Sequence, residues 1–245
     1  MRPSIFQNVI PAEQLDVAAL RLPGMRPVGD RPWITVDDAY AAQMAERRAL
    51  MTDHRRLVCD VLPEAQDGFD ELLDHCLHQM DLHDRFEVGD GQVVRPDGAV
   101  IAIDRSDPCL TLATLLQEDL CLLEKQGDEH VLTGAVLCFP SNWTLDEKIG
   151  RPLMRIHKPI PEYDEGVGKR VQRLFDGVQP GMPIWRANSV VHDAPDLFQP
   201  KREAEVKAYS TNGRYLRSER QTVLRLPKTR AVLFAIHTSV VPLTD

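Results

Sequence analysis

Residues 216–241, LRSERQTVLRLPKTRAVLFAIHTSVV, carry the pattern that decides the fold. Run 216–226 is polar and charged over 217–222, run 231–241 is largely apolar and rich in β-branched residues, and the short segment 227–230 separates them. A proline followed by polar residues between two such runs is typical of the turn of a β-hairpin. The stretch therefore predicts two long strands joined by a short turn.

Charged side chains are unusually frequent in the first of these two strands. Successive side chains of a strand point to opposite faces of a sheet. Alternation places Arg217, Glu219 and Gln221 on one face and Ser218, Arg220 and Thr222 on the other. Such a polar face is either a solvated surface or an inner wall that orders an anion, oxygen or an amine.

Working outward from the hairpin, helices come first in the chain and strands follow. We predict an extended arm without regular structure over 1–35. Helices are predicted over 37–62, 64–82, 110–120 and 165–178, and a capped helical turn is predicted to open at 144–147. Strands are predicted over 87–94, 99–103, 121–125, 130–139 and 183–192. Neither repeats nor an obvious linker divide residues 1–245, so we expect one domain, with the arm (1–35) and a helical extension (36–83). Helices followed by a largely antiparallel sheet indicate an α+β fold.

The composition of the chain argues against several classes of function. The formal net charge is −8, which disfavours nucleic acid as a partner. The five cysteines are odd in number and form no Cys-x-x-Cys pair, which argues against disulfides, a zinc ribbon and an iron–sulfur cluster. No stretch approaches the roughly 20 apolar residues that span a bilayer, and the N-terminal segment lacks the pattern of a signal peptide. We expect a cytoplasmic protein with no membrane partner.

His157 is a candidate metal ligand among the eight histidines. It lies in residues 153–161, LMRIHKPIP, where Pro159 and Pro161 lack backbone donors and fix φ, so the chain leaving His157 is predicted to be stiff and extended. A histidine held in this way suits a metal of fixed geometry. A buried histidine bonded to a carbonyl would explain the same pattern.

Three other histidines leave different alternatives open. His192, followed by Asp193 and Pro195, is interpreted as a structural histidine at a turn. His130 follows a turn at 127–129 and is predicted to be exposed. Alternation places His237 with Leu233 and Ala235, where it either lines a pocket or faces solvent.

Several familiar signatures are absent from the sequence. There is no Gly-x-Gly-x-x-Gly, no phosphate-binding Gly-x-x-x-x-Gly-Lys-Ser/Thr, no Gly-x-Ser-x-Gly and no Cys-x-x-Cys-His. Nucleotide cofactors and covalently attached haem are therefore unsupported. Spacing alone indicates an α+β domain with a possible histidine ligand.

A succession of short segments is similar to the haem-dependent oxidative N-demethylase α-subunit-like family. The matching segments are Arg26-Pro27 with Trp33, Asp37-Asp38 with Tyr40, 46–48 (ERR), 117–120 (QEDL), 138–143 (CFPSNW), 147–150 (EKIG), 156–161 (IHKPIP) with Tyr163, 186–188 (RAN) through His192-Asp193, 217–222 (RSERQT), 225–227 (RLP) and 231–234 (AVLF). They follow one order over about residues 25–240, so the resemblance covers most of the chain.

This resemblance implies a fold, a cofactor and a reaction. The fold would be PAS-like, a sheet with helices on one side that encloses a non-covalent haem b. In the family's characterised type, dimethylamine is oxidised with O2 to methylamine and formaldehyde, and electrons come from NADPH through a separate flavin and iron–sulfur reductase. The implied function is thus a haem-dependent monooxygenase subunit acting on a small amine. The alternative is a PAS-like haem-binding sensor without turnover, and a third possibility is an inactive assembly subunit.

The resemblance also implies roles for particular residues. His157, within the Ile-His-x-Pro-x-Pro segment, corresponds to the iron ligand, and His237 is a candidate sixth ligand. Arg186, Asn188, Glu219 and Arg220 are the candidates for the distal side, where Glu219 would hold a cationic amine and an arginine would polarise oxygen or pair with a haem propionate. Ser239 stands where a tyrosine is expected in many relatives. If that position lines the substrate pocket, a substrate other than dimethylamine is implied.

Overall fold

The strands form two antiparallel sheets in the computed structural model, which describes residues 4–20, 24–159, 163–205 and 212–243. The large sheet has the order β1-β8-β9-β10-β6-β7-β2, and the small one the order β3-β4-β5. The strands are β1 (Arg26–Pro27), β2 (Cys59–Val61), β3 (Glu87–Gly89), β4 (Gln92–Val94), β5 (Val100–Ala102), β6 (Asp119–Gln126), β7 (Glu129–Val136), β8 (Ile184–His192), β9 (Tyr215–Arg225) and β10 (Val232–Pro242). The helices are α1 (Ala12–Ala18), α2 (Tyr40–Asp53), α3 (Arg55–Val58), α4 (Gln66–Asp81), α5 (Pro108–Leu115), α6 (Leu153–His157), α7 (Glu165–Gly177) and the 3-10 helix η1 (Pro63–Ala65). The predicted α+β class is confirmed.

The hairpin predicted from residues 216–241 is formed by β9 and β10, which pair along the whole length of β10. Helix α4 fixes the turn between them. The carboxylate of Glu71, on α4, accepts hydrogen bonds from the backbone N–H groups of Lys228 at 2.6 Å and Thr229 at 2.7 Å. These charge-assisted bonds tie the turn to the first helical layer and place β10 beside β6 in the middle of the sheet.

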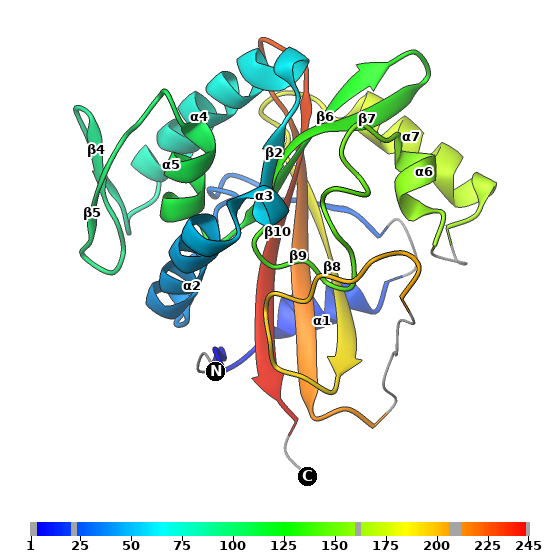
Figure 1. Ribbon diagram of the computed structural model, residues 1–245, viewed down its shortest axis with the longest axis horizontal. Coiled ribbons are helices and arrows are strands. Elements are labelled where there is room, and N and C mark those ends of the chain that lie inside the picture. Colours follow the sequence, from blue (N-terminus) through cyan, green and yellow to red (C-terminus); the bar gives the residue numbers. More distant parts are fainter. Residues whose placement is uncertain (1–3, 21–23, 160–162, 206–211, 244–245) are drawn as a thin grey trace.

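Helices cover both faces of the large sheet (Figure 1), so the one-sided arrangement implied by the resemblance is wrong. On the first face, under α2, α4 and α5, Met44, Phe69 and Leu112 are fully buried in the larger core. On the second face, under α6 and α7, Phe175 packs with Val223 in a smaller core. Burying one such large side chain stabilises the fold by about 1.5–3 kcal/mol. Both helical layers therefore hold the sheet.

The helix predicted over 37–62 is too long. Residues Tyr40–Asp53 and Arg55–Val58 are helical, but Cys59–Val61 form β2 and pair antiparallel with β7. The free edge of β7 supplies backbone partners to this segment. Hydrophobic periodicity along the chain cannot report such a partner, which comes from residues far away in the sequence.

The helix predicted over 110–120 begins and ends earlier, as α5. Its N-cap is Asp107, whose carboxylate accepts a hydrogen bond from the Leu110 N–H at 3.1 Å. After Leu115 the chain becomes extended, and β6 begins at Asp119. The buried Asp119 carboxylate accepts bonds from the backbone N–H groups of Cys138 at 2.7 Å and Phe139 at 2.8 Å. These long-range bonds favour the extended conformation.

Two further local predictions are wrong, and a third is confirmed. The arm predicted to be irregular contains α1, whose Val17 is buried in the larger core. The single strand predicted over 87–94 is two strands, because Gly91, with φ +78°, turns the chain between β3 and β4. The predicted helical turn after Thr144 is present: Thr144 donates a hydrogen bond to Glu147 at 3.0 Å, and the Ile149 N–H donates to the Leu145 carbonyl at 2.9 Å, although no longer helix follows.

Candidate functional site

A cavity of about 410 Å³ lies on the second face of the sheet, beside α6 and α7. Apolar side chains form most of one part of its wall. They include Leu123, Leu153, Ile156, Val171, Leu174, Phe175, Val223 and Phe234. Polar side chains from β8 and β9 form another part. The cavity thus has an apolar and a polar region, as ligand sites in proteins commonly do.

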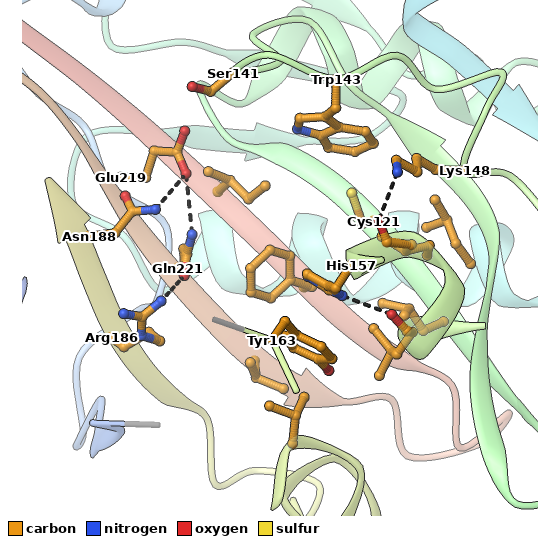
Figure 2. Close-up of a pocket in the computed structure, with 18 of the residues that line it drawn as sticks. Cys121, Ser141, Trp143, Lys148, His157, Tyr163, Arg186, Asn188, Glu219 and Gln221 are labelled. Atoms are coloured by element: carbon orange, nitrogen blue, oxygen red, sulfur yellow. Dashed lines mark hydrogen bonds between the residues drawn. The ribbon is translucent and has the colours of Figure 1, made fainter. Parts of the chain in front are cut away.

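His157 lines this cavity as the last residue of α6 (Figure 2). Its Nδ1 lies 2.9 Å from the carbonyl oxygen of Leu153. A carbonyl can only accept, so Nδ1 carries the proton and Nε2 keeps its lone pair. Burial lowers the pKa of His157, which favours the neutral ring. The ring stacks on Tyr163, with centroids 4.1 Å apart.

The segment that presents His157 differs from the prediction. A short helix, not an extended strand, carries the ring, and Lys158 after it still has a helical conformation. Pro161 lies outside the described residues. The stiffness has another cause: the ring is bonded to the backbone one helical turn earlier, so its orientation is fixed relative to α6.

The polar wall consists of two opposed pairs on β8 and β9. Arg186 lies opposite Gln221, and Asn188 lies opposite Glu219. Arg186 Nη1 donates to Gln221 Oε1 at 2.8 Å, while Gln221 Nε2 and Asn188 Nδ2 donate to Glu219 Oε2 at 3.2 and 3.3 Å. Figure 2 shows these four side chains in one continuous row along the cavity. The alternation predicted for Glu219 and Gln221 is confirmed, and their face is an inner one.

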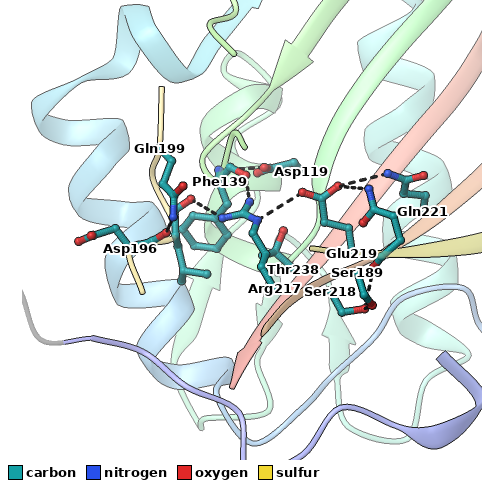
Figure 3. A network of polar contacts seen from close by, with 12 residues as sticks. Asp119, Phe139, Ser189, Asp196, Gln199, Arg217, Ser218, Glu219, Gln221 and Thr238 are labelled. Carbon is teal, nitrogen blue, oxygen red and sulfur yellow. Dashed lines mark hydrogen bonds and ion pairs between the residues drawn. The ribbon is translucent and has the colours of Figure 1, made fainter. Parts of the chain in front are cut away.

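Arg217 is bound to the carboxylate of Glu219 (Figure 3). Its side chain is only 2% exposed, and its Nε lies 3.3 Å from Glu219 Oε1. Nη1 donates to the Leu197 carbonyl at 3.0 Å, and Nη2 donates to the Phe139 carbonyl at 2.6 Å. The Phe139 N–H is in turn bound by Asp119. Arg217 therefore joins the polar wall to two loops and to β6.

His237 and Arg220 lie on the opposite face of the sheet, away from this cavity. His237 Nε2 is 3.3 Å from Asp37 Oδ2, and both groups are largely buried. The Arg220 guanidinium lies over the Trp185 ring, 3.9 Å from its centroid. The structure therefore contradicts the expectation that His237 and Arg220 contribute to the same site as His157. Strand alternation had separated Arg220 from Glu219 without showing which face carries the cavity.

Sequence reasoning missed His192 as a residue of the cavity. It lines the cavity and is largely buried, whereas a structural role at a turn was predicted. Its position could have been found by alternation along β8, because residues 186, 188, 190 and 192 share one face. Trp143 and Cys121 also line the cavity, and no pattern in the sequence singles them out.

The burial of His130 and Ser239 corrects two further expectations. His130, predicted to be exposed, is fully buried, and Gln172 Nε2 donates to its Nδ1 at 2.7 Å. Ser239 is 3% exposed and falls on the same face of β10 as His237, opposite the cavity-lining Phe234 and Ile236. A tyrosine at position 239 would not line this cavity. The residue therefore says nothing about the size of a substrate there.

Three buried polar atoms of the cavity wall have no hydrogen-bond partner within the described ranges. They are Tyr163 Oη, Arg186 Nε and His192 Nε2. Buried polar groups in folded proteins are almost always hydrogen-bonded. All three residues line the cavity, and each of these atoms is itself buried within its wall.

The comparison with known families gives one match. The model of the family described as haem-dependent oxidative N-demethylase, alpha subunit-like, matches residues 24–245. The match extends over nearly the whole chain and includes every residue that lines the cavity. Among the described residues, no helix is long and apolar enough to cross a membrane.

Proposed function

This chain belongs to the haem-dependent oxidative N-demethylase alpha-subunit-like family, and from that premise we propose that it binds haem b through His157 and oxidises a small amine. The observation that carries the proposal is the state of the His157 ring. Its Nδ1–H is committed to a backbone carbonyl, and its neutral Nε2 is free to bind a metal in the cavity. Metal-binding histidines commonly donate their other N–H to a carbonyl or carboxylate.

The remaining wall residues fit the proposed cofactor. A haem presents a broad apolar surface, and the cavity offers a wall of apolar side chains beside His157. The described residues contain no group of three or more His, Cys, Asp or Glu side chains placed to hold a metal ion. A single protein ligand suffices when a macrocycle supplies the other donors.

Roles for the polar wall follow from its charges. Glu219 is the carboxylate that we assign to the ammonium group of the amine, and Asn188 and Gln221 fix its orientation. A carboxylate has about four lone-pair sites, and three donors reach Glu219, so one acceptor site remains. Arg220 has no part in this site, and neither does His237.

The reaction consumes O2, two electrons and two protons for each methyl group removed, and it releases the shortened amine, formaldehyde and water. When bound, haem supplies the oxygen-activating chemistry. The electrons come from outside the chain, and we assign them to a separate NADPH-dependent flavin and iron–sulfur reductase. The alpha-subunit-like family name implies a partner subunit, and the five cysteines of the chain are free thiols.

The haem proposal is tested by reconstitution with haem and absorption spectroscopy. We expect a Soret band in the wild-type protein, its loss or a shift with at least tenfold weaker haem binding in His157→Ala, and no change in the matched control His78→Ala. His78 is exposed on α4. Circular dichroism checks that each variant is folded. A folded wild-type protein that binds no haem would refute the proposal.

Enzyme and sensor are distinguished with the haem-loaded protein. A chemical reductant, O2 and a panel of methylated amines are added, and formaldehyde is measured. Release of formaldehyde in proportion to amine consumed supports the monooxygenase. Haem binding without amine-induced spectral change and without formaldehyde would favour the non-catalytic haem-binding sensor.

A further inference from the structure

The positive and negative charges of the side chains that line the cavity are unequal in number. They are Lys148, Arg186, Arg217 and Glu219. Lys148 is paired with Glu203, which lies outside the lining. Arg217 is paired with Glu219 at 3.3 Å. Within the described residues, Arg186 has no carboxylate partner, so the polar wall carries one excess positive charge.

Arg186 is also incompletely hydrogen-bonded. One of its N–H groups reaches the neutral amide oxygen of Gln221, and its Nε is buried without a partner in the part of the chain that the structure describes. Burial lowers the pKa of Arg186, and the charge of the nearby Glu219 carboxylate opposes this shift. A guanidinium with free donors matches the planar geometry of a carboxylate. The wall therefore offers a binding place for an anionic group.

The position at which Arg186 can bind an anionic group lies close to the Glu219 carboxylate. Gln221 accepts a bond from Arg186 through Oε1 and donates one to Glu219 through Nε2. The two opposite charges are thus separated by a single side-chain amide (Figure 2). A ligand that carries an ammonium and a carboxylate a few bonds apart can reach both, whereas a simple alkylamine reaches only Glu219.

We infer that the substrate is an amine that also carries a carboxylate, such as an N-methylated amino acid, with its carboxylate bound by Arg186 and its ammonium bound by Glu219. This inference rests on the proposed function, because it takes the amine site at Glu219 from there. It adds that substrates without a carboxylate bind weakly. Removal of a methyl group from such a molecule yields the parent amino acid and formaldehyde, with the same balance of O2, electrons and protons.

The test compares two probes of similar size, N-methylglycine and N-methylglycinamide, by isothermal titration calorimetry on the haem-reconstituted protein. A charge-assisted hydrogen-bond pair corresponds to about a 10- to 100-fold change in affinity. We expect the wild-type protein to prefer N-methylglycine by about this factor. Arg186→Gln should remove the preference, and Arg186→Lys should keep part of it. Glu219→Gln should weaken both probes alike.

Arg56→Gln is the matched control, since Arg56 is exposed on α3, and it should leave the preference unchanged. Equal affinity of the wild-type protein for the two probes would refute the inference while the haem proposal stands. A preference that survives in Arg186→Gln, together with a loss of haem from that variant, would also refute it, because Arg186 would then bind a haem propionate. The haem content is read from the absorption spectrum before each titration. Failure of the proposed function is therefore seen separately from failure of this inference.

Discussion

The His237–Asp37 pair on the first face of the sheet is a buried ion pair with a defined pH dependence. Burial by itself raises the pKa of Asp37, but hydrogen bonding and charge from His237 outweigh it and lower the pKa to about 2. For His237, burial lowers the pKa, and Asp37 with Glu118 outweighs this effect and raises it, while Arg220 opposes the rise. At neutral pH the folded protein therefore favours a charged pair.

The sign of the stability change follows from these directions. A group whose pKa is higher in the folded state stabilises the protein fully below its unfolded value, about 6.5 for histidine. This contribution is lost as the pH rises through the raised pKa of His237. The Asp37 contribution, about 2 kcal/mol for a shift from 3.8 to about 2, is lost only as the pH falls through about 4 to 2.

We expect His237→Gln to lower the free energy of unfolding by about 3 kcal/mol at pH 6, because it leaves a buried carboxylate without its partner. The difference from wild type should shrink as the pH is raised above 6.5. Urea unfolding at several pH values between 6 and 9 measures it. Asp38→Asn, at an exposed neighbouring carboxylate, is the control. A difference that grows with pH would contradict the assignment of charge to His237.

The close packing of α4 against β7 depends on a glycine. Gly134, on β7, faces the fully buried ring of Phe69, on α4. A Cβ atom at Gly134 would lie 2.4 Å from Phe69 Cε2, closer than any ordinary contact. Gly134→Ala should therefore force the helix or the ring to move and destabilise the protein by about 1–3 kcal/mol. The absent side chain is what lets α4 approach the sheet so closely.

The matched control for Gly134→Ala is Gly177→Ala at the end of α7, where an added Cβ meets nothing within 4 Å. We expect this control to change the free energy of unfolding by less than about 1 kcal/mol. Thermal and urea unfolding of both variants give the comparison. Equal stabilities of the two variants would show that Phe69 moves at no cost.

Elements with strong local patterns could be predicted from the sequence, and contacts between distant segments could not. The alternation placed Glu219 and Gln221 on one polar face without deciding whether that face was inner or solvated, and β8, β9, β10, α4 and α7 all occur close to their predicted places. The strand β2 could not be predicted, because its partner is β7. Nor could the face of the cavity be known, since α6 and α7 define it. The proline context of His157 indicated a fixed ring and left open a bond to a carbonyl, but it did not identify Leu153 as the residue whose carbonyl accepts the Nδ1–H hydrogen bond.

At the scale of the whole molecule, both cores share the same strands. Strands β6, β9 and β10 contribute residues to the larger and to the smaller core. Because the two cores share these strands, loss of packing in one core disturbs the strands on which the other core packs. We expect the haem-free protein to unfold in one cooperative transition, as one domain. Differential scanning calorimetry measures it: the calorimetric and van't Hoff enthalpies should agree. Two resolved transitions would contradict the single domain.

The alternation along β10 also has a consequence for how such a protein can diverge. Phe234 and Ile236 line the cavity, while Leu233, Ala235 and His237 face the larger core. Inheritable changes at neighbouring codons of this segment therefore act on different properties: changes at Phe234 or Ile236 alter which molecule the cavity accepts, and changes at Leu233, Ala235 or His237 alter the stability of the fold. A lineage can explore new chemistry on one side of a single strand while the other side keeps the fold intact.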